Sequence, residues 1–311
     1  MVKMANRYGV TEFGDASQLH AQQQALPDLA PEQVMIRVIS SSVNPIDIKT
    51  RQGLGYVAAQ KAPGTFLPLG YDVYGEVIAV AEANSSVAVG DEVIGMVGFA
   101  QHPGCYADYV IADHHELVKV DTQQQPDIAG LCLAGLTAKQ ALDRFEDKSK
   151  PLFIVAPTGG VGHLAIQLAQ LQGREVIAVS RRPEHELLNS LGVKAITYDS
   201  FWQQQQQGDL LDLIGDKIAI QCLSALQTGS QVVTIPSNTS AAVCERAAAL
   251  GIDCQGMLVQ SNQDDLKYLY QAYQTGKIKV MVSHYFALDE LQRAHQCVES
   301  GAHYAKVILK A

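Results

Sequence analysis

The sequence feature that most constrains how this chain can fold is a glycine-rich turn between a short apolar run and a helical pattern. The apolar run is residues 153–156, and Gly159 and Gly162 stand three positions apart in the turn. In dinucleotide-binding turns the first glycine of such a pair lets a pyrophosphate approach the backbone, and the second lets helix and strand pack closely. Pro157 departs from the pattern, because it occupies the position of the first glycine of G-x-G-x-x-G. The turn predicts a phosphate site at a helix N-terminus, formed by Thr158, Gly159, Gly160, Val161 and Gly162.

The residues after the turn predict a β-α-β unit. Leu164, Leu168 and Leu171 recur at helical spacing, and Gly173 marks the end of the helix. A second apolar run at residues 175–180 supplies the next strand. This alternation is typical of a parallel sheet that is covered by helices.

The end of that second strand predicts which nicotinamide cofactor binds. NAD-binding proteins carry an acidic residue roughly 20 residues beyond the glycines, and this chain has Ser180, Arg181 and Arg182 there instead. Two guanidinium groups and a hydroxyl suit a 2′-phosphate, so the sequence predicts NADPH rather than NADH. The alternative is that the arginines only solvate the end of a strand.

The composition excludes several classes of protein. The chain has 311 residues, which is long enough for two domains, and its net charge of −9 argues against a general nucleic-acid or membrane-surface binder. No apolar run reaches the length of a membrane span, so we expect a cytoplasmic protein. The six cysteines form no C-x-x-C pair and are expected to be free thiols. Glutamine runs at 22–24, 123–125 and 203–207 are expected to be loops.

Taken in order, the chain predicts two kinds of domain. The first ~125 residues alternate as a mostly-β module with long connections. About six strands interleaved with helices follow, including one expected strand at residues 218–223, which is the count of a complete doubly wound sheet. After a helix at residues 263–275, short strands and one helix over residues 280–311 return to the first module.

Several segments, in the same order along the chain, resemble the zinc-independent quinone oxidoreductase branch of the medium-chain dehydrogenase/reductase superfamily. They are Asn44–Gly53, Leu69–Glu76, Val89–Val93, Ala134–Ala138, Gly159–Gly162 and the ending from Leu288 to Leu309. The resemblance implies an α/β protein in which a Rossmann doubly wound parallel sheet is inserted in a GroES-like, mostly-β catalytic domain. It also implies a homodimer. The expected domains are 1–126 with 264–311 for the catalytic part and 127–263 for the NADPH-binding part.

The zinc-dependent relatives in this superfamily have three catalytic ligand positions, which this chain fills with other residues. Asn44 replaces a cysteine, Tyr71 replaces a histidine and Leu133 replaces a second cysteine. These side chains cannot assemble a tetrahedral zinc site of nitrogen and sulfur ligands. The four-cysteine structural zinc lobe is also missing, since only Cys105 lies near that segment. We therefore predict no metal, and hydride transfer from NADPH to a quinone or an α,β-unsaturated carbonyl.

The resemblance implies roles for individual residues of the catalytic part. Asn44 and Thr137 would face the nicotinamide end of the site, and Asp47 would fix the loop of the Asn-Pro-x-Asp motif. Lys49 would reach a ribose hydroxyl or the substrate carbonyl, and Tyr71 would cap the substrate pocket. For each residue the alternative is a satisfied polar group of the core or of a loop.

Two further positions bear on the cofactor. Tyr198, just after the third strand, matches a tyrosine that lies by the adenosine phosphate in relatives. Ala305 stands where many relatives have glycine before Lys306, which is a departure from the family pattern.

Two other functions compete with the quinone or enone reductase. One is the reduction of an enoyl thioester, which calls for a basic patch that holds a phosphopantetheine tail. The other is a non-catalytic NADPH-binding protein of the kind found in the lens. Steady NADPH consumption with any acceptor would distinguish an enzyme from a binding protein.

Overall fold

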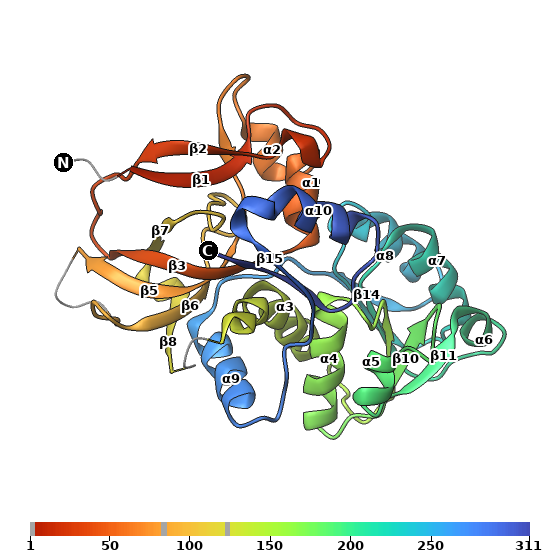
Figure 1. The fold of residues 1–311 in the computed structure, drawn as a ribbon. Coiled ribbons are helices and arrows are strands. Elements are labelled where there is room, and N and C mark those ends of the chain that lie inside the picture. The colour runs from red at the N-terminus through yellow and green to blue at the C-terminus, as the bar shows by residue number, and fades with distance from the viewer. Residues whose placement is uncertain (1–3, 82–85, 122–124) are drawn as a thin grey trace. The chain divides into compact units, whose positions relative to one another are not determined.

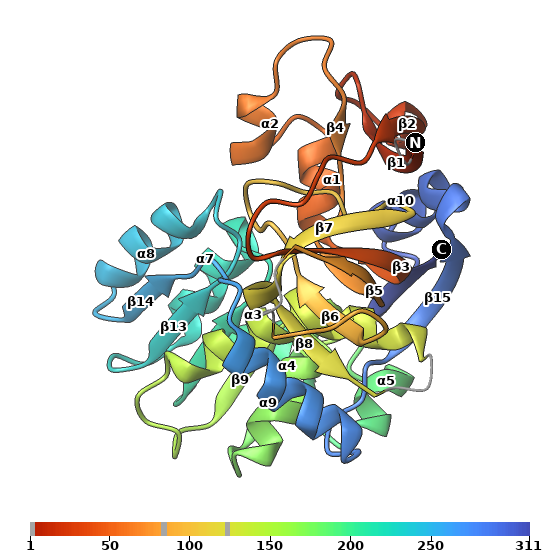
Figure 2. The ribbon, with the colours of Figure 1, turned by 90° about the vertical axis from the view of Figure 1, so that its left-hand side faces the viewer.

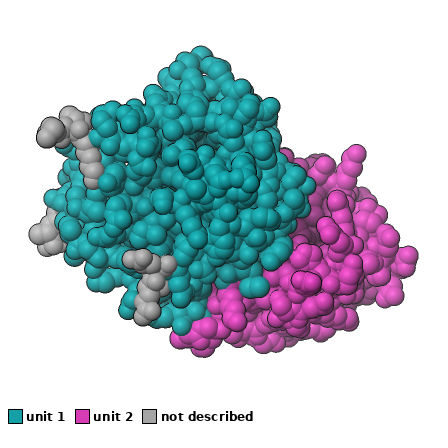
Figure 3. Space-filling view, viewed as in Figure 1, with its two compact units in different colours: residues 1–136, 260–274, 280–311 teal, residues 137–259, 275–279 magenta. Residues whose placement is uncertain are grey.

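The computed structural model describes residues 4–81, 86–121 and 125–311. The chain forms two compact units, shown in different colours in Figure 3. The first unit comprises residues 1–136, 260–274 and 280–311, and the second comprises residues 137–259 and 275–279. The second unit is therefore an insertion in the chain of the first.

The second unit is built on a six-stranded sheet in which all the pairs are parallel. The strands lie in the order β11-β10-β9-β12-β13-β14 (Figure 1). This is the order 3-2-1-4-5-6 of a doubly wound dinucleotide-binding sheet, so the predicted fold of this part is confirmed. The strands are β9 (Leu152–Val155), β10 (Val176–Ser180), β11 (Lys194–Thr197), β12 (Asp209–Asp212), β13 (Gln231–Thr234) and β14 (Asp253–Gly256).

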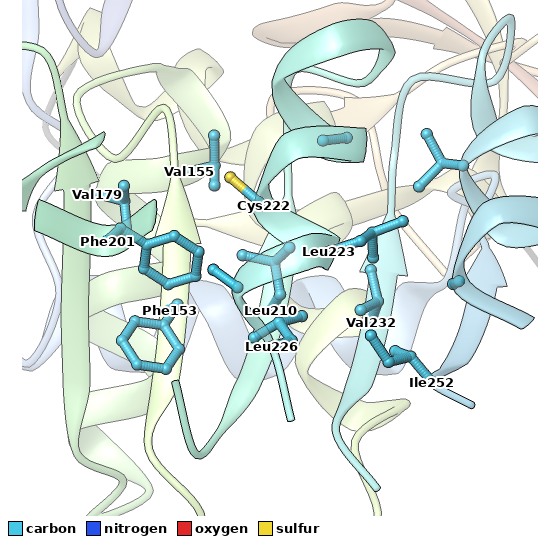
Figure 4. Packing of buried hydrophobic residues seen from close by; sticks show 14 of the residues in the cluster. Phe153, Val155, Val179, Phe201, Leu210, Cys222, Leu223, Leu226, Val232 and Ile252 are labelled. Carbon is cyan, nitrogen blue, oxygen red and sulfur yellow. The ribbon is translucent and has the colours of Figure 1, made fainter. Parts of the chain in front are cut away.

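Five helices accompany this sheet, and apolar side chains fill the space between them and the strands. Figure 4 shows part of this core, where Phe153 and Leu210 of the sheet pack with Phe201 and Leu223 of two helices. The rings of Phe153 and Phe201 meet edge to face with centroids 4.9 Å apart. The helices are α4 (Gly160–Leu171), α5 (Glu186–Ser190), α6 (Tyr198–Trp202), α7 (Asp216–Ala225) and α8 (Ser240–Ala248).

The predicted strand at residues 218–223 is wrong, because these residues lie in helix α7. Ala219, Cys222 and Leu223 are buried at helical spacing, so one face of the segment packs on the sheet. The strand of this region is β12, which pairs with both β9 and β13. A six-residue apolar run fits either a strand or one face of a helix, and the pairing partners decide between them.

The first unit is mostly β, as predicted, and contains two sheets. The larger sheet has seven described strands, of which six follow one path in the order β15-β16-β3-β5-β6-β8, and β7 lies off this path and pairs with β3. Figure 2 shows β3, β5, β6 and β8 as neighbouring strands. The smaller sheet has the order β2-β1-β4. The strands are β1 (Met4–Val10), β2 (His20–Ala25), β3 (Gln33–Val43), β4 (Leu67–Pro68), β5 (Asp72–Val80), β6 (Glu92–Met96), β7 (Tyr109–Asp113), β8 (Leu117–Val120), β15 (Val282–Ala287) and β16 (Lys306–Lys310).

Short helices lie in the connections within the first ~125 residues, where the sequence pattern predicted only long connections, whereas the helices expected at 263–275 and within 280–311 are present. The helix after β3 is one of them, because Asn44 precedes a proline that favours the first helical position. The α-helices are α1 (Pro45–Arg51), α2 (Tyr56–Gln60), α9 (Gln263–Gln274) and α10 (Leu291–Glu299), while α3 (Cys132–Asp143) continues into the second unit. In the described part of the first unit there are also four 3-10 helices, at Ala16–Gln18, His114–Glu116, Pro126–Leu131 and Leu288–Glu290.

The chain end returns to the first unit, as expected. Strand β16 pairs antiparallel with β3, so that Val307 lies opposite Val43, and β15 pairs parallel with β16. This pairing brings residues about 260 positions apart into the same sheet. Among the described residues, no helix is both long enough and apolar enough to cross a membrane.

The expectation that all six cysteines are free thiols is wrong for one pair. Cys244 of α8 and Cys254 of β14 form a disulfide with their Cα atoms 5.0 Å apart. Helix α8 packs on β14, which brings the two side chains within bonding range. The other four cysteines, Cys105, Cys132, Cys222 and Cys297, are free thiols.

One glutamine run is also not a loop. Gln22, Gln23 and Gln24 lie in β2 and pair with β1. The side chains of β2 are mostly exposed, so the strand carries no apolar alternation that the sequence could reveal. The run 203–207 connects α6 to β12, and most of the run 123–125 lies outside the described residues.

Candidate functional site

The glycine turn of the second unit joins β9 to α4 and leaves the start of the helix accessible. Helix α4 begins at Gly160, and Thr158, Gly159 and Val161 are partly exposed. The first N–H groups of a helix have no partners within the helix, and they lie at the positive end of its dipole. The turn therefore offers an anion site of the kind that holds a dinucleotide pyrophosphate.

Gly162 is required by close packing at this turn. A Cβ atom at Gly162 would lie 2.4 Å from the carbonyl oxygen of Ala156 and 2.8 Å from Pro157. A Cβ at Gly159 would meet the Ala156 oxygen at an ordinary 3.4 Å. Gly162 thus serves the packing of helix on turn, whereas Gly159 keeps the approach to the backbone open.

The carboxyl end of β10 presents the predicted arginines. Arg181 and Arg182 are exposed, and no described residue forms an ion pair with either of them. Ser180 is buried, and its Oγ accepts a hydrogen bond of 3.1 Å from the backbone N–H of Arg182. The serine therefore shapes the turn, while both guanidinium groups remain available to a ligand.

Tyr198 connects these two parts of the second unit. It is the first residue of α6, directly after β11, and only 8% of it is exposed. Burial raises the pKa of Tyr198 to about 12, against a hydrogen bond with the backbone of Ala156 and the charge of Arg181. The phenol thus lies between the glycine turn and the arginine side of the site, and it keeps its proton at neutral pH.

In the first unit Asn44 lies at the junction of β3 and α1. Its backbone N–H donates to Oδ2 of Asp47 at 2.8 Å, and Tyr106 donates to the same oxygen at 2.8 Å. Oδ1 of Asp47 is buried without a partner among the described residues. Burial raises the pKa of Asp47 to about 7, although these two hydrogen bonds oppose the shift.

A buried polar network surrounds the Asn44 side chain. Nδ2 of Asn44 donates to Oδ2 of Asp72 at 2.7 Å, and Ser42 donates to the same oxygen. The other oxygen of Asp72 accepts the backbone N–H of Leu133, at the start of α3, at 2.7 Å. Nζ of Lys306 donates to Oδ1 of Asn44 at 2.6 Å and lies 3.6 Å from Oδ2 of Asp72. Each of these side chains except that of Leu133 is polar, and each of the five residues is buried.

The structure places the remaining predicted residues as follows. Tyr71 is 1% exposed, and its hydroxyl has no hydrogen-bond partner among the described residues. Its ring meets Phe99 edge to face at 5.1 Å, and burial raises the pKa of its phenol. Lys49 is partly buried on α1, and Thr137 is buried in α3 one turn after Leu133. A buried phenol with a free O–H can donate to an oxygen that gains negative charge.

Three residues stand where the zinc-dependent relatives have their metal ligands, namely Asn44, Tyr71 and Leu133, and the described residues around them do not form a zinc site. Asn44 is engaged by Asp72 and Lys306, and Leu133 offers a backbone N–H rather than a ligand. Elsewhere, the described residues contain one group of side chains that could hold a metal ion, Asp113 with His114 and His115.

Sequence reasoning missed the most buried members of this site. The sequence pattern predicted no role for Asp72 or Lys306 beyond their place in segments that resemble the family, although both are hydrogen-bonded to the side chain of Asn44. His295 of α10 is buried, neither of its ring nitrogens is hydrogen-bonded to a described residue, and its ring meets that of Tyr106 with centroids 5.9 Å apart. The lysine that directly precedes the apolar run 307–309 of the last strand was the available signal, because charged residues are rarely buried without a partner.

Comparison with known proteins agrees with this geometry. Residues 30–122 match the alcohol dehydrogenase GroES-like domain family, and residues 193–309 match the family described as zinc-binding dehydrogenase. The structure of a quinone oxidoreductase from Coxiella burnetii superposes with a TM-score of 0.93 and 34% identity, over 99% of this chain and 100% of that chain.

Two plant enzymes are also similar in sequence. The 2-methylene-furan-3-one reductase of Solanum lycopersicum is 29% identical over 97% of this chain and 78% of its own length. The chloroplastic NADPH-dependent alkenal/one oxidoreductase of Arabidopsis thaliana is 31% identical over 83% of this chain and 66% of its own length. The GroES-like part, the doubly wound sheet and these similarities agree along the whole chain. The protein therefore belongs to the quinone oxidoreductase branch of the medium-chain dehydrogenase/reductase superfamily.

Proposed function

We propose that this protein is an NADPH-dependent reductase of quinones or α,β-unsaturated carbonyl compounds. The observation that carries the proposal is the pair of exposed arginines, which form no ion pair with a described carboxylate, at the strand end next to an accessible glycine turn. The relatives named as a quinone oxidoreductase and an NADPH-dependent alkenal/one oxidoreductase support the same class of reaction.

The residues of the second unit fit this cofactor. The N-terminus of α4 suits the pyrophosphate, and Arg181 and Arg182 suit the 2′-phosphate, because a guanidinium binds phosphate oxygens through paired donors. Tyr198 lies by the same turn and would pack near the adenosine phosphate. NADPH bound there supplies a hydride, which the electron-poor carbon of a quinone or enone accepts.

The first unit and helix α3 supply the groups that would act on the substrate. Hydride arrival places negative charge on the substrate carbonyl oxygen, which hydrogen-bond donors stabilise. The Tyr71 hydroxyl is a buried donor without a partner among the described residues, so it is the first candidate, and the ammonium group of the partly buried Lys49 is a second candidate donor. Asn44 and Thr137 would hold the reacting ring. The reaction needs no metal in this proposal, because the acceptor itself delocalises the charge.

The deciding experiment is an NADPH-oxidation screen across quinones, enals, enones and enoyl thioesters. We expect turnover with a quinone or an enone, and less with NADH in place of NADPH. Turnover restricted to enoyl thioesters would favour the thioester reductase. Tight NADPH binding without oxidation by any acceptor would favour a non-catalytic binding protein.

Two properties of the protein in the cell belong to the same proposal. We propose a homodimer, since β14 ends the parallel sheet and no described strand pairs with its outer edge. Light scattering coupled to size-exclusion chromatography tests it, and a monomeric mass would refute it.

We also propose a cytoplasmic location. Four free thiols are typical of a reducing compartment and the single disulfide is not, so cell fractionation decides.

A further inference from the structure

Lys306 is a buried cation in the first unit that the proposed function leaves without a role. It begins β16, and only 2% of it is exposed. Its Nζ donates to Oδ1 of Asn44 at 2.6 Å, with a longer contact of 3.4 Å to the carbonyl oxygen of Val43. Burial lowers the pKa of Lys306, while the nearby Asp72 and Asp47 raise it. Such a charge is costly to bury, so its partners matter.

The carboxamide of Asn44 has only one orientation that satisfies both of its neighbours. The ammonium group of Lys306 can only donate, so it must face Oδ1 of Asn44. An ionised Asp72 can only accept, so it must face Nδ2, which lies 2.7 Å away. Rotating the amide by half a turn would set donor against donor and acceptor against acceptor. The two charged groups therefore fix the amide between them.

The backbone just before Lys306 shows independent evidence of constraint. Ala305 has a φ of 47°, in the left-handed region that residues with a Cβ rarely adopt, and it is buried. Such strain persists only where the surrounding structure demands it, and it collects at functional sites. The chain thus accepts a strained residue directly before the lysine that reaches Asn44.

We infer that Lys306 is a positioning residue, which holds the Asn44 carboxamide in its working orientation without touching the substrate. This inference rests on the proposed reductase function for its catalytic consequence. The opposite charges of Lys306 and Asp72 balance each other, so the site gains an oriented amide dipole and no net charge. Lys306 and Asp72 thus fix the position of Asn44 by hydrogen bonds, as a bound metal fixes the position of its ligands by coordination.

The first experiment compares two lysines of the same strand. Lys306→Met removes the buried cation, and Lys310→Met is the matched control, because Lys310 is exposed at the end of β16. We expect Lys306→Met to lower kcat by about 10- to 100-fold, since small displacements of positioning groups have effects of this size. The KM for NADPH should change less than about twofold, and Lys310→Met should leave both constants unchanged.

A second variant separates positioning from simple charge balance. Lys306→Met combined with Asp72→Asn removes both buried charges, so the melting temperature should return toward that of the wild type. If Lys306 positions Asn44, kcat stays low in this double variant. Recovery of kcat together with the melting temperature would overturn the inference. In an Asn44→Ala background Lys306→Met should lower kcat no further, and fully multiplicative effects would also overturn it.

A third readout does not depend on activity. The side-chain amide signals of Asn44 in an NMR spectrum can be assigned by their loss in Asn44→Ala. We expect a dispersed and exchange-protected pair of signals in the wild type and in Lys310→Met, and an averaged pair in Lys306→Met. Unchanged signals in Lys306→Met would refute the positioning role. If none of the tested acceptors supports NADPH oxidation by the wild type, the proposed function fails. The NMR spectrum still decides the role of Lys306 in that case.

Discussion

Tyr106 donates a hydrogen bond of 2.8 Å to Asp47, and its ring also meets the ring of His295. The fold shifts the pKa values of these two buried neighbours in opposite directions. On one side burial raises the pKa of Asp47 from 3.8 to about 7, with Asp72 adding to the shift and Lys306 opposing it. On the other side the ring of Tyr106 meets His295, where burial and the charge of Arg51 lower the pKa of the imidazole from 6.5 to about 3. Between about pH 3 and 7, therefore, a protonated Asp47 carboxyl and a neutral His295 imidazole both lie against the Tyr106 phenol.

The contributions of Asp47 and His295 to the pH dependence of the free energy of unfolding are expected to cancel. Between pH 3.8 and 6.5 the folded protein holds one proton more at Asp47 than the unfolded chain, so this group favours folding at low pH and loses that effect as pH rises toward 7. In the same window the folded protein holds one proton fewer at His295, so that group stabilises above pH 6.5 and loses its effect as pH falls. The two slopes are equal and opposite.

We predict that removing either group reveals how the other group makes the free energy of unfolding depend on pH. Asp47→Asn keeps an acceptor for Tyr106 and should lose stability on acidification, by up to about 1.4 kcal/mol per pH unit relative to the wild type. His295→Phe should gain stability relative to the wild type over the same change. Urea denaturation at pH 4.5, 5.5 and 6.5 measures both differences. Parallel curves for all three proteins would show that neither group is shifted in the folded state.

The glycine turn allows packing and ligand binding to be tested separately. At Gly162 a Cβ would lie 2.4 Å from a backbone oxygen, so Gly162→Ala should lower the melting temperature and Gly162→Val should abolish NADPH binding or unfold the unit. Gly159→Ala is the matched control, because a Cβ there makes an ordinary contact. It should leave the melting temperature nearly unchanged and weaken NADPH binding. Equal melting temperatures for wild type and Gly162→Val would contradict the assigned role.

The cofactor preference should depend on the two arginines at the end of β10. Each hydrogen bond to a charged group contributes roughly 1.5–3 kcal/mol, and less when exposed. Arg181→Ala with Arg182→Ala should therefore raise the KM for NADPH by about 10- to 100-fold and leave the KM for NADH nearly unchanged. Arg246→Ala, an exposed arginine of α8, is the control. Added salt should reduce the preference of the wild type. Full discrimination in the double variant would mean that the arginines only solvate the strand end.

The disulfide between α8 and β14 predicts a thiol count. Protein denatured without reductant should react with Ellman's reagent at four cysteines, and at six after reduction. Cys244→Ser should lower the free energy of unfolding by about 2–4 kcal/mol when compared with oxidised wild type, and by much less when both are reduced. Six reactive thiols without reductant would show that the bond is absent in the purified protein.

Metal content is the last prediction. Asn44 is held by Lys306 and Asp72, and Tyr71 and Leu133 are poor zinc ligands, so we expect no stoichiometric zinc and no effect of a chelator on activity. Elemental analysis and assays with and without EDTA check both points. If some zinc is found, His115→Ala tests whether it lies at the Asp113–His115 group instead. One zinc per chain whose removal stops activity would overturn the metal-free mechanism.

The sequence by itself determined the features that depend on neighbouring residues. The turn from Thr158 to Gly162, the helix behind it and the arginines after β10 follow from spacing within about 30 residues, and the structure has these elements where they were predicted. Their interpretation is local, because a strand, a tight turn and a helix N-terminus need few partners to be recognised. The interleaving of about six strands with helices followed in the same way from the alternation of short apolar runs with helical patterns, although one expected strand, at residues 218–223, is a helix.

The tertiary structure decided what depends on distant partners. Residues 218–223 became a helix because β12, and not they, pairs with β9 and β13. Cys244 and Cys254 form a bond because α8 packs on β14. Asn44, Asp72 and Lys306 meet because β16 pairs with β3 across some 260 residues, and no local pattern contains that information. A buried charge is stable only beside its partner, so the role of each of these residues is fixed by packing of the chain and not by its own sequence context.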